Sequence, residues 1–121
     1  MKTVLIVDDS SLMRRIIRHI VIKNGYDVIG EANNGRLGVE KYKELSPDIV
    51  TMDLVMDDMN GLEALKLIIE ENPKANVIMV SSMGQDVVVR DAILTGAKNF
   101  LLKPFDETQV VDAIKKLETT V

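Results

Sequence analysis

The sequence predicts an α/β fold in which five parallel strands form one open, doubly wound sheet. Short runs of β-branched residues alternate with longer amphipathic segments, this pairing repeats along the chain, and 121 residues suit one domain spanning 1–121. Five such units are too few for an eight-stranded barrel. Since parallel strands require right-handed crossovers, we expect the flavodoxin-like (βα)5 arrangement with strand order 2-1-3-4-5.

The expected elements follow one another along the chain. Strands are predicted at 3–7, 27–30, 48–52, 76–80 and 99–102, and helices at 11–24, 35–45, 61–71, 85–95 and 106–118. Turn residues agree with these boundaries. Asn24-Gly25 and Gly96 suit helix ends with a positive φ, and Ser46-Pro47 and Asn72-Pro73 break the chain before the third and fourth strands.

Apolar patterning predicts which surfaces are buried. The first and fourth strands are almost wholly apolar, as expected where helices cover both faces of a sheet. In the first helix we expect one apolar stripe to face the sheet and the arginines at 14, 15 and 18 to face solvent. That stripe consists of Leu12, Met13, Ile16, Ile17 and Ile20.

Composition excludes several classes of protein. Aromatic residues make up 3% of the chain, so the core must be aliphatic, and the absence of cysteine excludes disulfides and thiolate metal sites. The net charge of −4 argues against nucleic-acid binding. No apolar run approaches the ~20 residues of a membrane span. We therefore expect a monomeric cytoplasmic protein that binds neither nucleic acid nor membrane.

Charged and hydroxyl side chains gather where the predicted strands end. Asp8 and Asp9 follow the first strand, Asp53 follows the third, Ser81 ends the fourth, and Lys103 follows the fifth. The carboxyl ends of parallel strands share one edge of the sheet, and in this strand order the first and third strands are neighbours at the switch point. We therefore expect these side chains to converge there.

Clustered carboxylates repel one another and call for a cation. Mg²⁺ is the natural complement, because it binds one or two carboxylates and leaves positions for water and a phosphoryl oxygen; Mn²⁺ is the expected substitute. A carboxylate in such a site can attack a phosphoryl group. Each residue alone has an ordinary interpretation: Asp8 or Asp9 as a helix cap, Lys103 as a surface lysine, Ser81 as a loop residue. Their combination favours phosphoryl chemistry.

Five motifs together resemble the two-component receiver domain family. They occur in the family's order and spacing over essentially the whole chain: Val7-Asp8-Asp9-Ser10, Met52-Asp53-Leu54, Met59-Asn60-Gly61, Ser81 and Lys103-Pro104-Phe105. The short chain further resembles single-domain chemotaxis regulators. It is also similar to the receiver portion of chemotaxis methylesterases.

The resemblance implies a role for each residue of the acidic site. Asp53 matches the phosphoacceptor, and Asp9 matches the direct Mg²⁺ ligand. Asp8 would bind the ion directly or through water, and Val55 would lend it a backbone carbonyl. Lys103 matches the lysine that pairs first with the acceptor and then with the phosphoryl group.

The resemblance also implies a switch and partners. Ser81 matches the switch hydroxyl, which also stabilises the phosphoryl group, and Phe100 matches the aromatic residue that turns inward with it. A histidine kinase would supply the phosphoryl group. A downstream protein, such as a flagellar motor switch, would bind the face formed by the fourth helix, fifth strand and fifth helix. Val87 begins a run of three valines on this face. A phosphatase is a further expected partner. The protein would then not be an enzyme, apart from catalysing its own phosphoryl transfer and self-hydrolysis.

Two departures from the family pattern concern the loops around the site. Asp57 stands where the family usually has proline, and the loss of that proline would free the loop. We interpret Asp57 as part of a solvated acidic loop. The sharper hypothesis is that it creates a second, weaker ion site. Val55 and Met83 are apolar and cannot orient an attacking water. We therefore expect slower self-hydrolysis than in relatives with polar residues at these positions.

Three other functions remain to be weighed against this one. A receiver-fold binding module that no longer accepts phosphate is disfavoured by the intact Asp9, Asp53 and Lys103. A flavin-binding protein would need phosphate-cradling groups where Asp8 and Asp9 stand. A haloacid-dehalogenase-like phosphatase would carry a second acid at position 10, which is serine.

Overall fold

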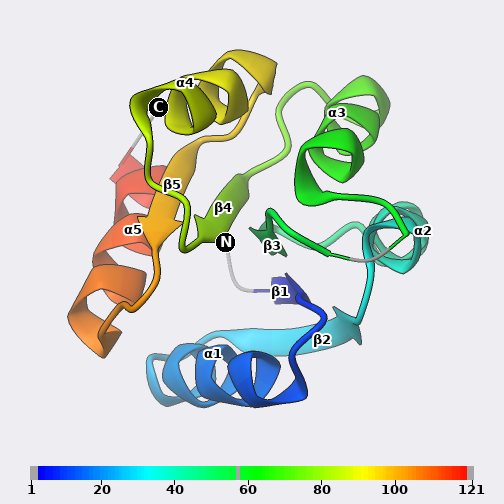
Figure 1. Cartoon of the computed structure of the whole chain (residues 1–121). Helices are drawn as coiled ribbons and strands as arrows, with labels where there is room; N and C mark the ends of the chain where they lie inside the picture. Colours follow the sequence, from blue (N-terminus) through cyan, green and yellow to red (C-terminus); the bar gives the residue numbers. More distant parts are fainter. Residues whose placement is uncertain (1–2, 57, 120–121) are drawn as a thin grey trace.

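Five parallel strands form one sheet with the order β2-β1-β3-β4-β5 in the computed structural model, which describes residues 3–56 and 58–119. The elements along the chain are β1 (Thr3–Val7), α1 (Ser11–Lys23), β2 (Asp27–Ala32), α2 (Gly35–Leu45), β3 (Ile49–Asp53), α3 (Gly61–Glu71), β4 (Val77–Ser81), α4 (Asp86–Thr95), β5 (Asn99–Leu102) and α5 (Glu107–Thr119). The expected fold class and strand order are confirmed (Figure 1).

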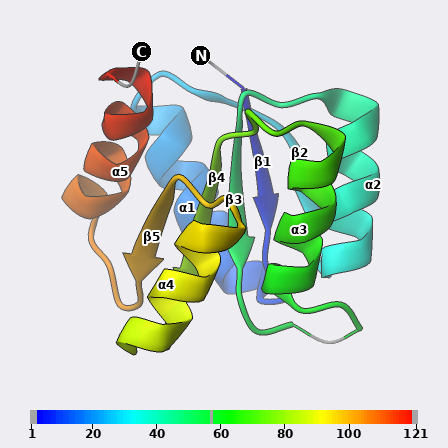
Figure 2. The same cartoon turned by 90° about the horizontal axis from the view of Figure 1, so that it is seen from above.

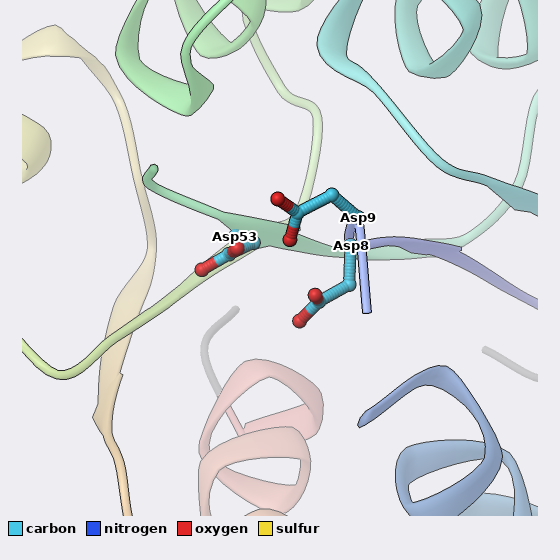
Figure 3. A group of neighbouring side chains, drawn as sticks. All are labelled: Asp8, Asp9 and Asp53. Carbon is cyan, nitrogen blue, oxygen red and sulfur yellow. The ribbon is translucent and has the colours of Figure 1, made fainter. Parts of the chain in front are cut away.

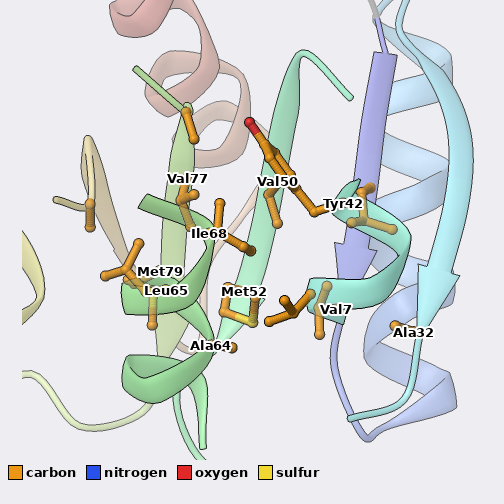
Figure 4. Packing of buried hydrophobic residues seen from close by; sticks show 14 of the residues in the cluster. Val7, Ala32, Tyr42, Val50, Met52, Ala64, Leu65, Ile68, Val77 and Met79 are labelled. Atoms are coloured by element: carbon orange, nitrogen blue, oxygen red, sulfur yellow. The ribbon is translucent and has the colours of Figure 1, made fainter. Parts of the chain in front are cut away.

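Helices cover both faces of the sheet (Figure 2). On one face α2, α3 and α4 bury a cluster that includes Val7, Met52 and Leu65 (Figure 4). On the other face α1 and α5 pack over Ile6 and Ile78 of the sheet, and Ile114 of α5 is buried in this cluster. Every residue of β3 and β4 is buried, and the almost wholly apolar sequence of β4 is the one expected for a strand covered on both faces.

The observed strand boundaries refine the expected positions of Asp53 and Ser81 at the carboxyl edge of the sheet. Asp53 is the last residue of β3, paired in register with Val80, rather than the residue after the strand. Ser81 ends β4 as expected, opposite Leu102 of β5. The remaining differences are of one or two residues at the ends of strands and helices, where backbone hydrogen bonding, rather than local composition, decides.

Side-chain caps fix where several helices begin at this edge. The side-chain oxygens of Ser10, Asn34 and Asn60 accept hydrogen bonds from the N–H groups of Met13, Leu37 and Glu63, at 3.1, 2.8 and 2.9 Å. Each cap satisfies a donor that the first helical turn leaves without a partner. At the opposite helix ends, Gly25 and Gly96 have φ values of +93° and +131°, as the sequence indicated.

The buried face of α1 differs from the prediction. Ile17, Ile20 and Val21 are buried, whereas Leu12 and Ile16 are exposed. Apolar residues surround more than half of this helix, so periodicity alone could not set its rotation about the axis. None of the helices within the described ranges is long and apolar enough to span a membrane.

Candidate functional site

Three carboxylates meet at the carboxyl edge of the sheet, where β1 and β3 lie side by side (Figure 3). Asp8, Asp9 and Asp53 each offer an oxygen, and these oxygens all lie within 4.8 Å of one another. Asp8 and Asp53 are 1% and 5% exposed, and Asp9 faces solvent. The predicted convergence of the acidic residues is therefore present.

Asp8 is held at several atoms by its surroundings. Its backbone N–H donates to the Ala32 carbonyl of β2 at 3.0 Å, so the ladder of hydrogen bonds continues one residue beyond β1. Its Oδ1 accepts the N–H of Ser10 at 2.9 Å. The turn that carries Asp9 is thus built from the end of β1 and the cap of α1.

Asp53 is held by the backbone that follows it. The N–H of Leu54 donates to the Val80 carbonyl at 3.0 Å, and the N–H of Gly61 donates to the Leu54 carbonyl at 2.7 Å. A Cβ at position 61 would lie 2.1 Å from the carbonyl oxygen of Asp53. Glycine is therefore required at the start of α3, because the chain passes directly against the backbone of Asp53.

Lys103 reaches the acidic cluster from the end of β5. Its Nζ donates to Asp53 Oδ1 at 3.3 Å and to Asp8 Oδ2 at 3.4 Å. The backbone N–H of Lys103 donates to the Ser81 carbonyl at 2.7 Å, which anchors the residue to β4. One ammonium group therefore faces two buried carboxylates.

The pKa values of Asp8 and Asp53 follow from their burial and from the presence of one ammonium group beside two carboxylates. Burial, and then the charge of Asp8, raises the pKa of Asp53 from 3.8 to about 6, although Lys103 opposes the change. Burial also raises the pKa of Asp8, against the N–H of Ser10 and the charge of Lys103. The ionised cluster carries more negative charge than its surroundings compensate.

A hard divalent cation fits this donor set. The available ligands are carboxylate oxygens from Asp8, Asp9 and Asp53, which are of the type that Mg²⁺ prefers. The uncompensated charge described above would favour a cation at this place. The roles of individual ligands, including the carbonyl of Val55, stay predictions.

The expected switch residues are Ser81, at the end of β4, and Phe100 of β5. Ser81 is buried, and its Oγ accepts the N–H of Met83 at 3.0 Å. Phe100 is half-buried against the cluster beneath α2, α3 and α4. Ser81 and Phe100 lie on the adjacent strands β4 and β5, and their roles as a switch stay predictions.

The loop between β3 and α3 is partly tethered. Asp58 has φ of +69°, and Arg36 of α2 donates from Nε to its Oδ2 at 3.0 Å. This ion pair between two exposed side chains links the loop to α2, and the expected freedom of the loop without proline stays a prediction. Asp57 lies outside the described residues. Val55 and Met83 are both exposed, and their effect on self-hydrolysis stays a prediction.

One functional candidate was missed by the sequence reasoning. Arg14, assigned to a solvated face, lies inward against the turn that carries Asp8 and forms an ion pair with Glu31 of β2. The available signal was Glu31, a charged residue in a strand that must pack beneath a helix. Such a charge needs a partner, and Arg14 is one.

Comparison with known proteins gives consistent results. The family model of the response regulator receiver domain matches residues 4–115. The chain is 53% identical over 116 residues to the chemotaxis protein CheY of Thermotoga maritima, covering 96% of this chain and 97% of that protein. It is 52% identical over 113 residues to CheY of Bacillus subtilis, covering 93% and 94%.

Two further matches are informative. A protein-glutamate methylesterase/protein-glutamine glutaminase of Archaeoglobus fulgidus is 44% identical over 103 residues, which is 84% of this chain but 29% of that protein. The crystal structure of a CheX–CheY–BeF3–Mg²⁺ complex from Borrelia burgdorferi matches with a TM-score of 0.96 at 36% identity, covering 98% of this chain and 90% of that one.

Proposed function

This chain belongs to the response regulator receiver domain family, and we propose that it is a CheY-like phosphoryl-accepting switch in chemotaxis. The observation that carries the proposal is the convergence of Asp53 with Asp8, Asp9 and Lys103 at one edge of the sheet. The higher identity to the CheY relatives, 53% against 44% for the methylesterase, favours a CheY-like regulator over the receiver portion of a methylesterase.

In the proposed reaction Asp53 is the nucleophile. One of its carboxylate oxygens attacks the phosphorus of a phosphohistidine on a partner kinase, forming a P–O bond while the P–N bond breaks. The electron pair of that bond stays on the departing imidazole. Since the pKa of Asp53 is about 6 before a cation binds, the nucleophilic carboxylate is the main form above that pH.

The other residues balance charge during transfer. Asp8 and Asp9 would hold the Mg²⁺, with Mn²⁺ as a substitute, and the ion would neutralise charge on the phosphoryl oxygens. The ammonium of Lys103 lies 3.3 Å from Asp53 Oδ1 and would follow the negative charge onto the phosphoryl group. The hydroxyl of Ser81 is the proposed donor to a phosphoryl oxygen.

The signal would then reach the surface formed by α4, β5 and α5. Val87, Leu94 and Leu102 are exposed there, which suits a protein partner such as a flagellar motor switch. A histidine kinase as donor, a phosphatase that ends the signal, a cytoplasmic location and a monomeric state complete the proposal. No enzymatic activity is proposed beyond the protein's own phosphorylation and dephosphorylation.

Intact-mass measurement after incubation with Mg²⁺ and a small phosphodonor tests the proposal. A single phosphoryl adduct is expected in the wild-type protein and in Asp91→Asn, a control that changes an exposed carboxylate of α4. Asp53→Asn should give no adduct. A folded wild-type protein without an adduct would instead favour a receiver-fold module that binds partners independently of phosphorylation.

A further inference from the structure

Arg14 connects the acidic turn to the neighbouring strand. From the first turns of α1 its Nη1 donates to the backbone carbonyl of Asp8 at 2.7 Å, and its Nε donates to Glu31 Oε1 at 3.1 Å. The other oxygen of Glu31 accepts from Arg18 Nη1 at 3.0 Å. The Arg14 side chain is only 19% exposed, compared with 48% for Arg18.

The carbonyl that Arg14 holds belongs to the peptide joining Asp8 to Asp9. Asp8 is already fixed through its N–H, through Oδ1 by Ser10 and through Oδ2 by Lys103. Asp9 faces solvent, so the direction of its carboxylate depends on the backbone that carries it. Fixing the Asp8 carbonyl fixes the plane of that peptide and hence the starting direction of the Asp9 side chain.

We propose that Arg14 is a positioning residue of the cation site, which directs Asp9 toward Asp53 by holding the Asp8–Asp9 peptide. Glu31 orients the guanidinium so that the planar fork reaches the carbonyl. Arginine suits this task because its separate N–H groups can bind Glu31 and the carbonyl at once in a fixed geometry, whereas lysine offers a flexible point charge. The inference rests on the proposed function, since it requires that the site binds Mg²⁺.

The sign of the effect separates positioning from simple charge. A positive side chain near a cation site repels the cation, so removing the Arg14 charge alone would tighten Mg²⁺ binding. Losing the clamp on the peptide would weaken binding instead, since residues that orient metal ligands typically contribute about 10–100-fold in affinity. An ordinary ion pair between α1 and β2 would change stability without weakening Mg²⁺ binding.

Calorimetric titration of the unphosphorylated protein with MgCl2 at fixed ionic strength tests this proposal. We expect Arg14→Ala to raise the Kd for Mg²⁺ about 10-fold, and Arg14→Lys to recover part of the loss. The matched control is Arg18→Ala, which removes the same charge from the same helix and the same Glu31 but does not contact the Asp8 carbonyl. Its Kd should be unchanged or slightly lower.

Amide NMR spectra of each variant confirm that the compared proteins are folded, and the lysine variant serves if Arg14→Ala does not fold. Binding by folded Arg14→Ala as tight as in the wild type, or equal weakening by Arg18→Ala, would overturn the positioning role. If Arg14→Ala is unfolded, Mg²⁺ binding by folded Arg14→Lys with the affinity of the wild type would also overturn the positioning role. Absence of Mg²⁺ binding in the wild-type protein would instead overturn the proposed function, so the two failures are distinguishable.

Discussion

Removing the charge of Asp53 should stabilise the cation-free protein at neutral pH. The pKa of this carboxyl is raised from 3.8 to about 6, chiefly by burial and then by the charge of Asp8. A tenfold change in proton affinity corresponds to about 1.4 kcal/mol, so the ionised carboxylate destabilises the folded state by up to about 3 kcal/mol. Asp53→Asn keeps the shape without the charge and should recover a large part of this free energy.

The pH dependence has a defined sign. A raised pKa means that the folded state binds the proton more tightly than the unfolded chain, so the resulting stability is fully present below pH 3.8 and lost as the pH rises through about 6. The asparagine variant lacks this titration. The stability difference between the variant and the wild type should therefore be largest above pH 7, smaller at pH 4.5, and should vanish only below pH 3.8.

Urea unfolding in EDTA, followed by circular dichroism at pH 4.5 and 7.5, measures this difference. Asp91→Asn is the control, because it removes an exposed carboxylate and should change the free energy of unfolding little at either pH. Added Mg²⁺ should stabilise the wild type more than Asp53→Asn, since binding to the folded state adds stability by mass action. An Asp53→Asn protein no more stable than the wild type at pH 7.5 in EDTA would refute the electrostatic reasoning.

Three further substitutions test other features of the site. Thr51→Val should raise the free energy of unfolding by about 1 kcal/mol, because the buried Thr51 hydroxyl has no hydrogen-bond partner within the described part of the chain. Lower stability of the variant in urea would contradict this. Gly61→Ala should cost about 1–3 kcal/mol and slow phosphoryl acceptance, because a Cβ there would lie 2.1 Å from the Asp53 carbonyl oxygen; full stability and a normal rate of adduct formation would argue against that close approach. Val55→Asn should accelerate loss of the phosphoryl group by offering a polar side chain to an attacking water, and an unchanged decay rate would exclude this account.

The fold was predictable because its signals are local and repeated. β1 and β4 are short apolar runs separated by amphipathic segments, and the crossover rule reduces the possible topologies to few. The rotation of α1 was not predictable, since Leu12 and Ile16 extend its apolar surface beyond the face that packs on the sheet. The position of a helix about its axis depends on its contacts with other elements.

The acidic site was predictable for a geometric reason, while its supporting contacts were not. Parallel strands end at one edge, so Asp8 and Asp53 had to approach each other once β1 and β3 were neighbours. The contacts of Arg14 with Asp8 and of Arg36 with Asp58 join side chains of different elements. Such contacts depend on distances between elements that no sequence periodicity specifies.

The same arrangement suggests how a change at Asp53 would reach the partner surface. A phosphoryl group adds about −1.5 to −2 charges, which would draw the Lys103 ammonium away from Asp8. The backbone N–H of Lys103 donates to the Ser81 carbonyl, and a Cβ at Gly84 would lie 2.8 Å from Leu102 Cδ1, so the loop after β4 packs directly on the exposed Leu102 at the end of β5. Lys103 and Ser81 thus link the acidic site to the edge of the face formed by α4, β5 and α5 through adjacent strands. A phosphoryl group can shift this surface only as far as it binds one arrangement of these residues more tightly than the other.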